Sequence, residues 1–222
     1  SYHLGNISLQ ERIEGFSLQR VKGEVKRNTI IAYDLTDLSK ESAKKIPYLS
    51  RVFDGSEGTI TNGFVLHGVG VNNMLLKIEM HDGWHFTQNQ IRRRIIEYYA
   101  GIFGRKGIWV FDRGNDDKAF FKFLRRTANT QFIARLKENR QVVMKETGAI
   151  LKIREIPPGK YSIYLLNVHN IRVDNRFEYT LVIHKHLEGR KPMRLISWLK
   201  DDYPSEQIVN MYLQRWGIEN IF

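Results

Sequence analysis

The hydrophobic residues of the chain form two patterns, short apolar runs and longer segments with helical spacing. The short runs predict buried strands, and they lie at 29–33, 108–111 and 131–136. Apolar residues three and four positions apart predict helices, at 87–103 and from about 116 to 127. The spacing is looser in 1–28, which we interpret as a segment that leads into the main domain.

Between the first strand and the first of these helices, the pattern predicts a β-hairpin. Residues 63–71 and 74–80 are both β-like, and the Asn72-Asn73 pair between them suits a two-residue turn. A short helix at 39–45, with Ser39 as its N-cap, is predicted ahead of the hairpin. The resulting order of strand, hairpin, helix, strand, helix and strand is typical of a mixed α/β sheet layered with helices.

The pattern changes over 141–200, where one β-like segment follows another, separated by turn residues such as Pro157-Pro158-Gly159. This stretch is too long for a loop, so it predicts a β-rich lobe inserted before the last helix. The predicted division of the chain is therefore a lead-in segment at 1–28, a first core part at 29–140, the insertion at 141–200, and a helix at 201–222 that completes the core.

The last segment predicts a helix that holds charges near a core. Pro204 suits the first helical position, and at about 100° per residue two faces are apolar. One face carries Ile208, Tyr212, Arg215, Glu219 and Phe222, and the other carries Val209, Leu213 and Trp216. Buried charges need partners or a metal. Arg215 and Glu219 therefore form either an i,i+4 ion pair or part of a functional site.

Composition and charge indicate a polyanionic partner. The chain of 222 residues has 35 Lys and Arg against 24 Asp and Glu, a formal net charge of +11. Its basic residues recur in clusters at 92–94, 105–106, 125–126 and 190–194. Such an excess favours binding to nucleic acid.

Several other classes of protein and site are excluded. The chain has no Cys, so disulfides, thiolate zinc sites and cysteine nucleophiles are ruled out, and a reducing cytoplasm is expected. Neither a run long enough for a membrane span nor a signal peptide is visible. The chain starts at Ser1 without Met and stops inside a predicted helix, so we expect it to be a fragment.

Two acids directly follow predicted strands, Asp34 after 29–33 and Asp112 after 108–111. Each is either a cap or turn former, or a site residue at the edge of an α/β sheet where ligands bind. With Glu219, they make three carboxylates, which suit Mg²⁺ or Mn²⁺, often as two ions in phosphoryl transfer. Three further acids compete for these roles but better fit caps and turns: Asp37, Asp116 and Asp117.

Tyr212, Arg215 and Glu219, followed by Asn-Ile-Phe, resemble the Tyr-Arg-Glu signature of the IS4-type bacterial DDE transposases. Asp34 in Ile-Ala-Tyr-Asp-Leu-Thr is similar to the first catalytic Asp of that family, and Asp112 in Val-Phe-Asp-Arg-Gly to the second. The resemblance runs from about residue 29 to 222 and includes the β-rich insertion. The family motif continues with a Lys seven positions after the Glu, beyond Phe222.

This resemblance implies an RNase H-like fold and a metal-dependent endonuclease reaction on DNA. Asp34 would bridge two Mg²⁺ or Mn²⁺ ions, with Asp112 and Glu219 completing one each. Water would cut the DNA at transposon ends, and the freed 3′-hydroxyl would attack target DNA. Tyr212 and Arg215 would hold a DNA phosphate. The resemblance also implies a homodimer on paired ends, in a bacterial cytoplasm at the nucleoid, without a membrane partner.

Alternatives remain open at this point. An RNase H-fold nuclease or a domesticated transposase would cut DNA without joining it, and a DNA-binding scaffold with an inactive site is a third hypothesis. All three acids are present, which argues against the scaffold. Trp198 in the insertion is predicted either to stack on an unpaired base, as in the resembled family, or to pack within the lobe.

The histidines offer weaker hypotheses. His81 and His85 have zinc-ligand spacing, but Gly83 between them favours a turn. His184 and His186 fit surface or DNA contacts, and His67 in a β-like run fits a half-buried core residue.

Overall fold

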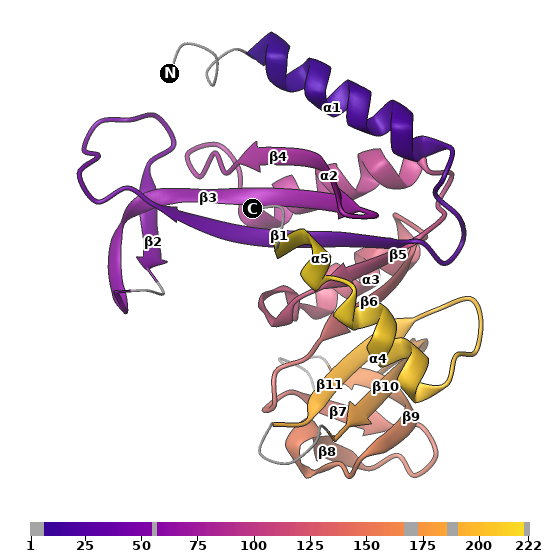
Figure 1. The fold of residues 1–222 in the computed structure, drawn as a ribbon. Helices are drawn as coiled ribbons and strands as arrows, with labels where there is room; N and C mark the ends of the chain where they lie inside the picture. Colours follow the sequence, from indigo (N-terminus) through magenta and orange to yellow (C-terminus); the bar gives the residue numbers. More distant parts are fainter. Residues whose placement is uncertain (1–6, 55–56, 167–172, 186–190, 220–222) are drawn as a thin grey trace. The chain divides into compact units, whose positions relative to one another are not determined.

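The computed structural model describes residues 7–54, 57–166, 173–185 and 191–219 (Figure 1). The chain divides into two compact units. Unit 1 comprises residues 1–107 and 216–222, and unit 2 comprises residues 108–215. None of the helices in the described ranges is long and apolar enough to cross a membrane.

Unit 1 is an antiparallel sheet with helices. Its strands are β1 (Ile30–Ser39), β2 (Ser50–Asp54), β3 (Thr59–Val71) and β4 (Met74–Met80). Its helices are α1 (Ile7–Lys22), α2 (Gln88–Ile102) and the short α5 (Trp216–Glu219). The long strand β3 organises the sheet, because it pairs with β1, β2 and β4.

The predicted hairpin is confirmed. Strands β3 and β4 pair from Val71 opposite Met74 to Leu66 opposite Met80. Asn72 and Asn73 between them both have positive φ, 50° and 59°, as a type I′ turn requires. The turn therefore forms because asparagine tolerates the left-handed conformation better than most residues.

Helix α2 also forms as predicted, and its first turn shows why it begins where it does. The Thr87 hydroxyl accepts from the Gln90 amide while the Gln90 side chain accepts from the Thr87 amide, a complete capping box. The apolar face of α2 is buried, and Tyr99 Oη donates to the Leu76 carbonyl at 3.2 Å. Helix α2 is thereby joined to strand β4.

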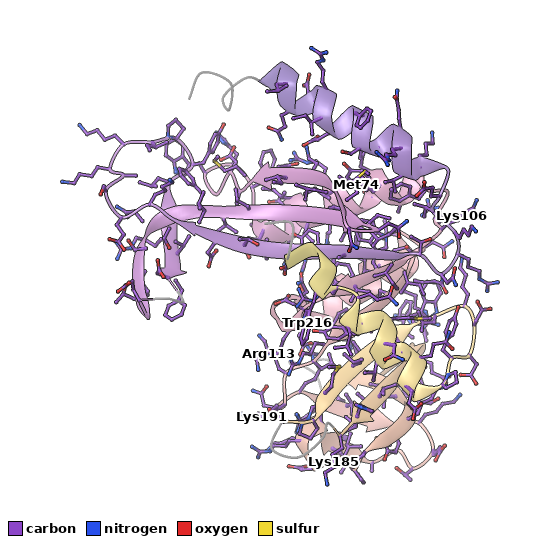
Figure 2. The ribbon with its side chains drawn as sticks, viewed as in Figure 1. Met74, Lys106, Arg113, Lys185, Lys191 and Trp216 are labelled. Carbon is purple, nitrogen blue, oxygen red and sulfur yellow. The ribbon has the colours of Figure 1, made fainter. Side chains whose placement is uncertain are left out.

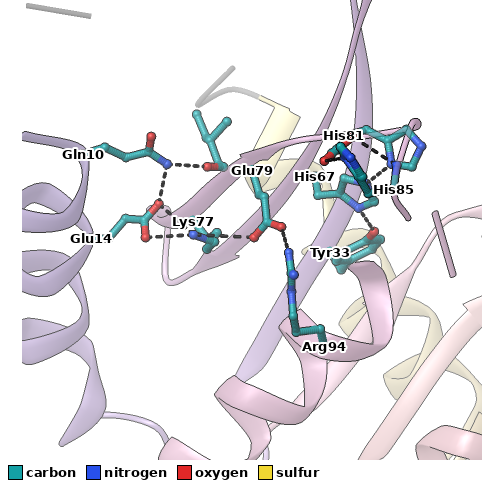
Figure 3. A network of polar contacts seen from close by, with 11 residues as sticks. Gln10, Glu14, Tyr33, His67, Lys77, Glu79, His81, His85 and Arg94 are labelled. Atoms are coloured by element: carbon teal, nitrogen blue, oxygen red, sulfur yellow. Dashed lines mark hydrogen bonds and ion pairs between the residues drawn. The ribbon is translucent and has the colours of Figure 1, made fainter. Parts of the chain in front are cut away.

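The lead-in segment contains a full helix, α1, which is attached to the sheet largely by polar side chains. Gln10 Nε2 donates to the Ile78 carbonyl at 2.8 Å, and Lys77 Nζ lies 3.1 Å from the Glu14 carboxylate (Figure 3). The apolar residues Ile13 and Phe16 are exposed, so the loose helical spacing reflects a helix with little buried surface.

Unit 2 is a larger sheet that begins with a parallel pair. Its strands are β5 (Ile108–Phe111), β6 (Gln131–Arg135), β7 (Gln141–Met144), β8 (Ile150–Lys152), β9 (Gly159–Leu166), β10 (Val173–His184) and β11 (Met193–Trp198). Its helices are α3 (Lys118–Arg126) and α4 (Ser205–Leu213), with short 3-10 turns at Arg113–Asn115 and Ile153–Glu155.

The strand order in unit 2 is β5-β6-β11-β10-β9-β7-β8. Strands β5 and β6 are parallel, and the other neighbours are antiparallel. The strands predicted for the insertion are therefore present, and they continue the sheet of β5 and β6 through the β6–β11 pair. The predicted mixed α/β fold with a β-rich part before the last helix is confirmed. The four-part division of the chain stays a prediction.

Three details of the sequence prediction are wrong. Asp34 does not end its strand, because β1 continues to Ser39 in an unbroken ladder with β3. The helix predicted at 39–45 is absent, and turns and bends occupy 41–45 instead. The last helix is broken, because α4 ends at Leu213 and α5 begins at Trp216.

Candidate active site

Asp112 is presented by the turn that follows the buried strand β5. All four residues of β5 are buried, and Asp112 leaves the strand in extended conformation at φ −72° and ψ 179°. It occupies the cap position of the next 3-10 turn, but its side chain makes no capping hydrogen bond. The side-chain Nδ2 of Asn115 donates to its Oδ1 instead. Asp112 therefore does not act as a cap through its side chain, and its bond to Asn115 fits the role of a turn former.

The chain beside Asp112 leaves little room for other side chains. A Cβ at Gly114 would lie 3.2 Å from Asp112 Oδ2, so glycine keeps the space next to the carboxylate clear. Asn115 is fully buried, which fixes the amide that holds the carboxylate. The Asp-Arg-Gly-Asn segment thus places a half-buried carboxylate at the end of a rigid strand.

The neighbouring acids have structural roles. Asp117 caps helix α3 by accepting from the Ala119 amide at 2.8 Å, as predicted. Asp116 is buried, where it lies 2.5 Å from Arg140 Nε and accepts from the Lys137 amide at 2.8 Å. Burial raises the pKa of Asp116 and Arg140 opposes that rise. Both acids are thereby removed from the list of candidate metal ligands.

Tyr212 and Arg215 lie in the same electrostatic neighbourhood as Asp112. Both are buried, with exposures of 2% and 6%, and Arg215 Cζ lies 6.0 Å from the Tyr212 ring centroid. Burial raises the pKa of the Tyr212 phenol, and the Asp112 carboxylate adds to that effect. The charges of Arg215 and Arg135, and a hydrogen bond from Arg215, oppose it. Unit 2 therefore brings an acid, a phenol and two guanidinium groups together.

Arg135 is the member of this group that the sequence pattern missed. It is the last residue of β6, which runs parallel to β5 with Ala134 opposite Phe111. Parallel neighbours place their carboxyl ends at one edge of a sheet, where ligands bind in α/β folds. The signal available in the sequence was a basic residue at the end of the strand that follows the Asp112 strand.

Asp34 lies in the middle of β1, within unit 1. Its partner on β3 is Gly68, which has no side chain to occupy the space across the strand pair. Its rival Asp37, on the same strand, has a raised pKa through burial, opposed by a hydrogen bond from the Phe53 backbone. Asp37 thus has a structural contact to β2, and Asp34 remains the candidate in this strand.

Glu219 is the last residue of α5, and its side chain lies outside the described residues. Helix α5 contacts β3, the strand that pairs with β1. A Cβ at Gly217 would lie 2.6 Å from Asn73 Oδ1, so α5 closely approaches the β3–β4 turn. The predicted Arg215–Glu219 ion pair stays a prediction.

The donor set fits a hard divalent cation, because Asp34, Asp112 and Glu219 supply only carboxylate oxygens. Within the described residues, no group of three or more His, Asp or Glu side chains could hold a metal ion. Asp34 and Asp112 belong to different units, and the Glu219 side chain is outside the described set. The triad therefore stays a prediction.

The structure shows the surroundings of His81, His85 and His184. Asp82 closes a turn by accepting from the Trp84 and His85 amides and by pairing with His85 Nδ1 at 2.7 Å, as Gly83 suggested. His81 Nδ1 instead lies 3.3 Å from the buried His67 (Figure 3). His184 is half-buried, and His186 lies outside the described residues.

Trp198 is half-buried at the end of β11. Arg125 Cζ lies 5.4 Å from its ring, a contact that fits packing within unit 2. Stacking of Trp198 on a base stays a prediction.

The fold defines the class of this protein as an α/β domain like that of a transposase catalytic domain. The piggyBac transposase, solved as a synaptic complex with hairpin DNA, matches with a TM-score of 0.53 at 13% sequence identity. The match covers 98% of this chain and 46% of that chain, so this chain spans about half the length of that protein.

The family of this chain is shown by a family model that matches its sequence. The model of the transposase DDE domain matches residues 79–222, nearly two thirds of the chain, and the chain belongs to this family. The match includes Asp112, Tyr212, Arg215 and Glu219, whereas Asp34 precedes it.

Two other comparisons gave one weaker structural match and no match among curated proteins. The Marinitoga piezophila Argonaute in complex with guide RNA and target DNA has a TM-score of 0.31 at 14% identity, over 86% of this chain and 26% of that chain. A search of curated proteins finds no match.

Proposed function

We propose that this chain is the catalytic domain of an IS4-type DDE transposase. It cleaves phosphodiester bonds at transposon ends in a metal-dependent reaction and joins the freed 3′-hydroxyl to target DNA. The observation that supports the proposal is that the charges of Asp112, Arg215 and Arg135 all act on the pKa of Tyr212, in a chain that belongs to the transposase DDE family.

Asp34, Asp112 and Glu219 hold the divalent cations in this proposal. Asp34, Asp112 and Glu219 would together hold Mg²⁺ or Mn²⁺ ions, two of them in this proposal, through their carboxylate oxygens. Such ions, when bound, activate the attacking oxygen and neutralise the charge on the leaving oxygen. The side-chain amide of Asn115 holds the Asp112 carboxylate through a hydrogen bond, and Gly114 leaves the space beside that carboxylate clear, so Asp112 would be available to hold an ion.

Tyr212 and Arg215 bind the phosphate next to the scissile bond. Because burial raises the pKa of Tyr212, its phenol keeps its proton at neutral pH and can donate it in a hydrogen bond to a phosphate oxygen. Arg215 and Arg135 supply positive charge at the same place, and a guanidinium can bind two phosphate oxygens at once. These groups position the DNA backbone for attack.

DNA is the proposed partner, both as transposon ends and as target. The net charge of +11 favours it, and exposed basic side chains on unit 2 include Arg113, Lys185 and Lys191 (Figure 2). The protein acts as a homodimer on paired ends and works at the bacterial nucleoid, in the cytoplasm.

The direct test compares Asp112→Asn with Asp117→Asn in a Mg²⁺-dependent cleavage and strand-transfer assay. Each change removes one carboxylate charge, and the two positions are five residues apart. Asn at position 117 still caps helix α3, so that variant should retain activity. Asn at position 112 removes a charged metal ligand, and cleavage should fall by at least about a hundredfold.

Other outcomes of this assay would contradict the proposal in distinct ways. Cleavage without joining by the parent chain would identify an RNase H-fold nuclease. DNA binding without Mg²⁺-dependent cleavage would identify an inactive DNA-binding derivative. Equal activity of the two variants would show that Asp112 is not a catalytic residue.

A further inference from the structure

A cluster of cations surrounds one aromatic ring on the surface of unit 2. The ring belongs to Phe177, in strand β10. Lys122 Nζ lies 5.3 Å from its centroid, Arg125 Cζ 5.4 Å and Arg176 Cζ 5.8 Å. Lys122 and Arg125 come from helix α3, so two elements far apart in the sequence contribute to one group. We call these four residues the Phe177 rim.

Arg125 anchors the rim. Its guanidinium also lies 5.5 Å from the Tyr179 ring and 5.4 Å from the Trp198 ring, and Nη1 donates to the Glu178 carbonyl. It is half-buried, so its charge is fixed within the packing of α3 against β10 and β11. Arg125 thereby joins helix α3 to strands β10 and β11 at the Phe177 ring.

The other two cations differ in exposure. Arg176 is exposed, and Lys122 is half-buried. Both meet the aromatic ring with their cationic ends, a contact that orients a flexible side chain without neutralising its charge. The neighbouring carboxylate of Glu178 lies 2.7 Å from Lys145 Nζ, and the hydrogen bond from Lys145 and the charge of Arg125 both lower its pKa.

Three like charges within about 6 Å of one ring repel one another, and an anion bound between them relieves that repulsion. Phosphates spaced along a nucleic acid backbone meet such a group of side chains without base recognition. The cations lie against the ring, so phosphate contact is favoured over base stacking on Phe177.

We propose that the Phe177 rim binds the phosphate backbone of DNA, through Lys122 and Arg176 in particular. This adds a DNA contact on α3 and β10 to the phosphate contacts of Tyr212 and Arg215, and it rests on the proposed function. The rim holds DNA without taking part in the chemical step.

The test measures the affinity of the whole chain for a fluorescein-labelled DNA duplex by anisotropy, without divalent metal, over a series of salt concentrations. The variant is Lys122→Gln with Arg176→Gln. Its control is Lys152→Gln with Arg154→Gln, which removes the same charge from one half-buried and one exposed residue of unit 2. Strand β8 lies three strands from β10 in the sheet, a separation of about 14 Å.

We expect the rim variant to bind at least about tenfold more weakly than the control variant at moderate salt. The slope of log affinity against log salt should fall by about 2 in magnitude, because two phosphate contacts are lost. Circular dichroism spectra of both variants should match the parent, since the changes lie at the surface.

Equal affinities and slopes for the two variants would overturn the rim as a DNA contact. Binding of an acidic protein segment to the rim, with unchanged DNA affinity in the variant, would overturn it as well. A parent chain that fails to bind DNA at all would instead overturn the proposed function, so the two failures are distinguishable.

Discussion

His67 is a fully buried histidine with a partner for each ring nitrogen. Its Nδ1 lies 2.6 Å from Tyr33 Oη, and its Nε2 lies 3.3 Å from His81 Nδ1 (Figure 3). Burial lowers the pKa of His67 to about 4, and the charges of His81, Arg92 and Arg94 contribute in the same direction. The folded chain therefore keeps this imidazole neutral, as expected for a histidine of the core.

This shift predicts loss of stability in mild acid. Between the ordinary histidine pKa and about 4, the unfolded chain binds a proton that the folded chain does not. Stability is therefore full above the unfolded pKa and falls as the pH drops, by about 2 kcal/mol between pH 7 and pH 5. Urea unfolding at the two pH values measures it.

The control for this prediction is an exposed histidine. His67→Gln should lose most of the pH dependence, while His85→Gln should keep it, because the His85 side chain is 68% exposed. The same loss of pH dependence in both variants would show that His67 is not the responsible group.

At the residue scale, the sequence predicted correctly that a strand ends just before Asp112 and wrongly that a strand ends at Asp34. Asp112 follows a strand whose four residues are all buried, so the apolar run and the strand end at the same place. Strand β1 continues past its buried residues, because the half-exposed segment after Tyr33 still pairs with β3. The end of an apolar run shows where burial ends, but strand pairing can continue beyond that point.

At the element scale, Gly63 shows how tightly the strands of unit 1 approach one another. A Cβ at this position would lie 2.5 Å from the Leu38 carbonyl oxygen, and the Val52 side chain would be closer still. Strands β1 and β2 both pair with β3 at Gly63. Only a residue without a side chain fits there.

Gly63→Ala should therefore destabilise the fold by about 2 kcal/mol, because the backbone has to shift to admit the methyl group. Gly15→Ala is the matched control, since nothing lies within 4 Å of a Cβ at Gly15 in helix α1. Alanine should stabilise that helix by up to about 1 kcal/mol. Thermal unfolding of the two variants measures the difference, and equal shifts would contradict the close approach.

The break in the last helix could not be predicted from its own residues. The segment Leu213-Gln-Arg-Trp216 favours helix throughout, and apolar spacing continues across it. At the break, the Arg215 backbone amide donates to the Tyr212 carbonyl three residues back, a tighter turn than that of an α-helix. Trp216, predicted on an apolar face, is 50% exposed. Helical propensity and apolar spacing alone therefore do not predict where this helix ends.

At the scale of the whole molecule, the net charge of +11 predicts a strong salt dependence of DNA binding. A protein that makes six to ten phosphate contacts loses roughly a thousandfold or more in affinity between 50 and 200 mM salt. We expect a loss of about this size for the parent chain, measured by anisotropy with a DNA duplex. Unfolding midpoints over the same range should change little, and an affinity independent of salt would contradict phosphate-based binding.

The whole-molecule organisation was predictable in its order of elements but not in its connections. Most of the succession of strands and helices followed from apolar spacing and turn residues, although β2 was missed and a helix was predicted at 39–45, where none forms. The continuity of the β-rich segment with the β5–β6 pair did not, because β6 and β11 meet only through pairing between distant residues. Arg135 was missed for the same reason, since its importance depends on which strand lies beside its own.

The β6–β11 pair also constrains how the chain can be made. Arg135 pairs with Leu195, and 195 minus 135 gives a separation of 60 positions along the chain. During synthesis, β6 therefore leaves the ribosome well before its antiparallel neighbour exists, with one row of backbone donors and acceptors unsatisfied on that side. Strand pairings between residues this far apart in the sequence form slowly, and until then they leave unpaired strand edges that are prone to aggregation. Newly made chains should thus depend on chaperones, or on slow translation through the intervening strands, to reach the native sheet.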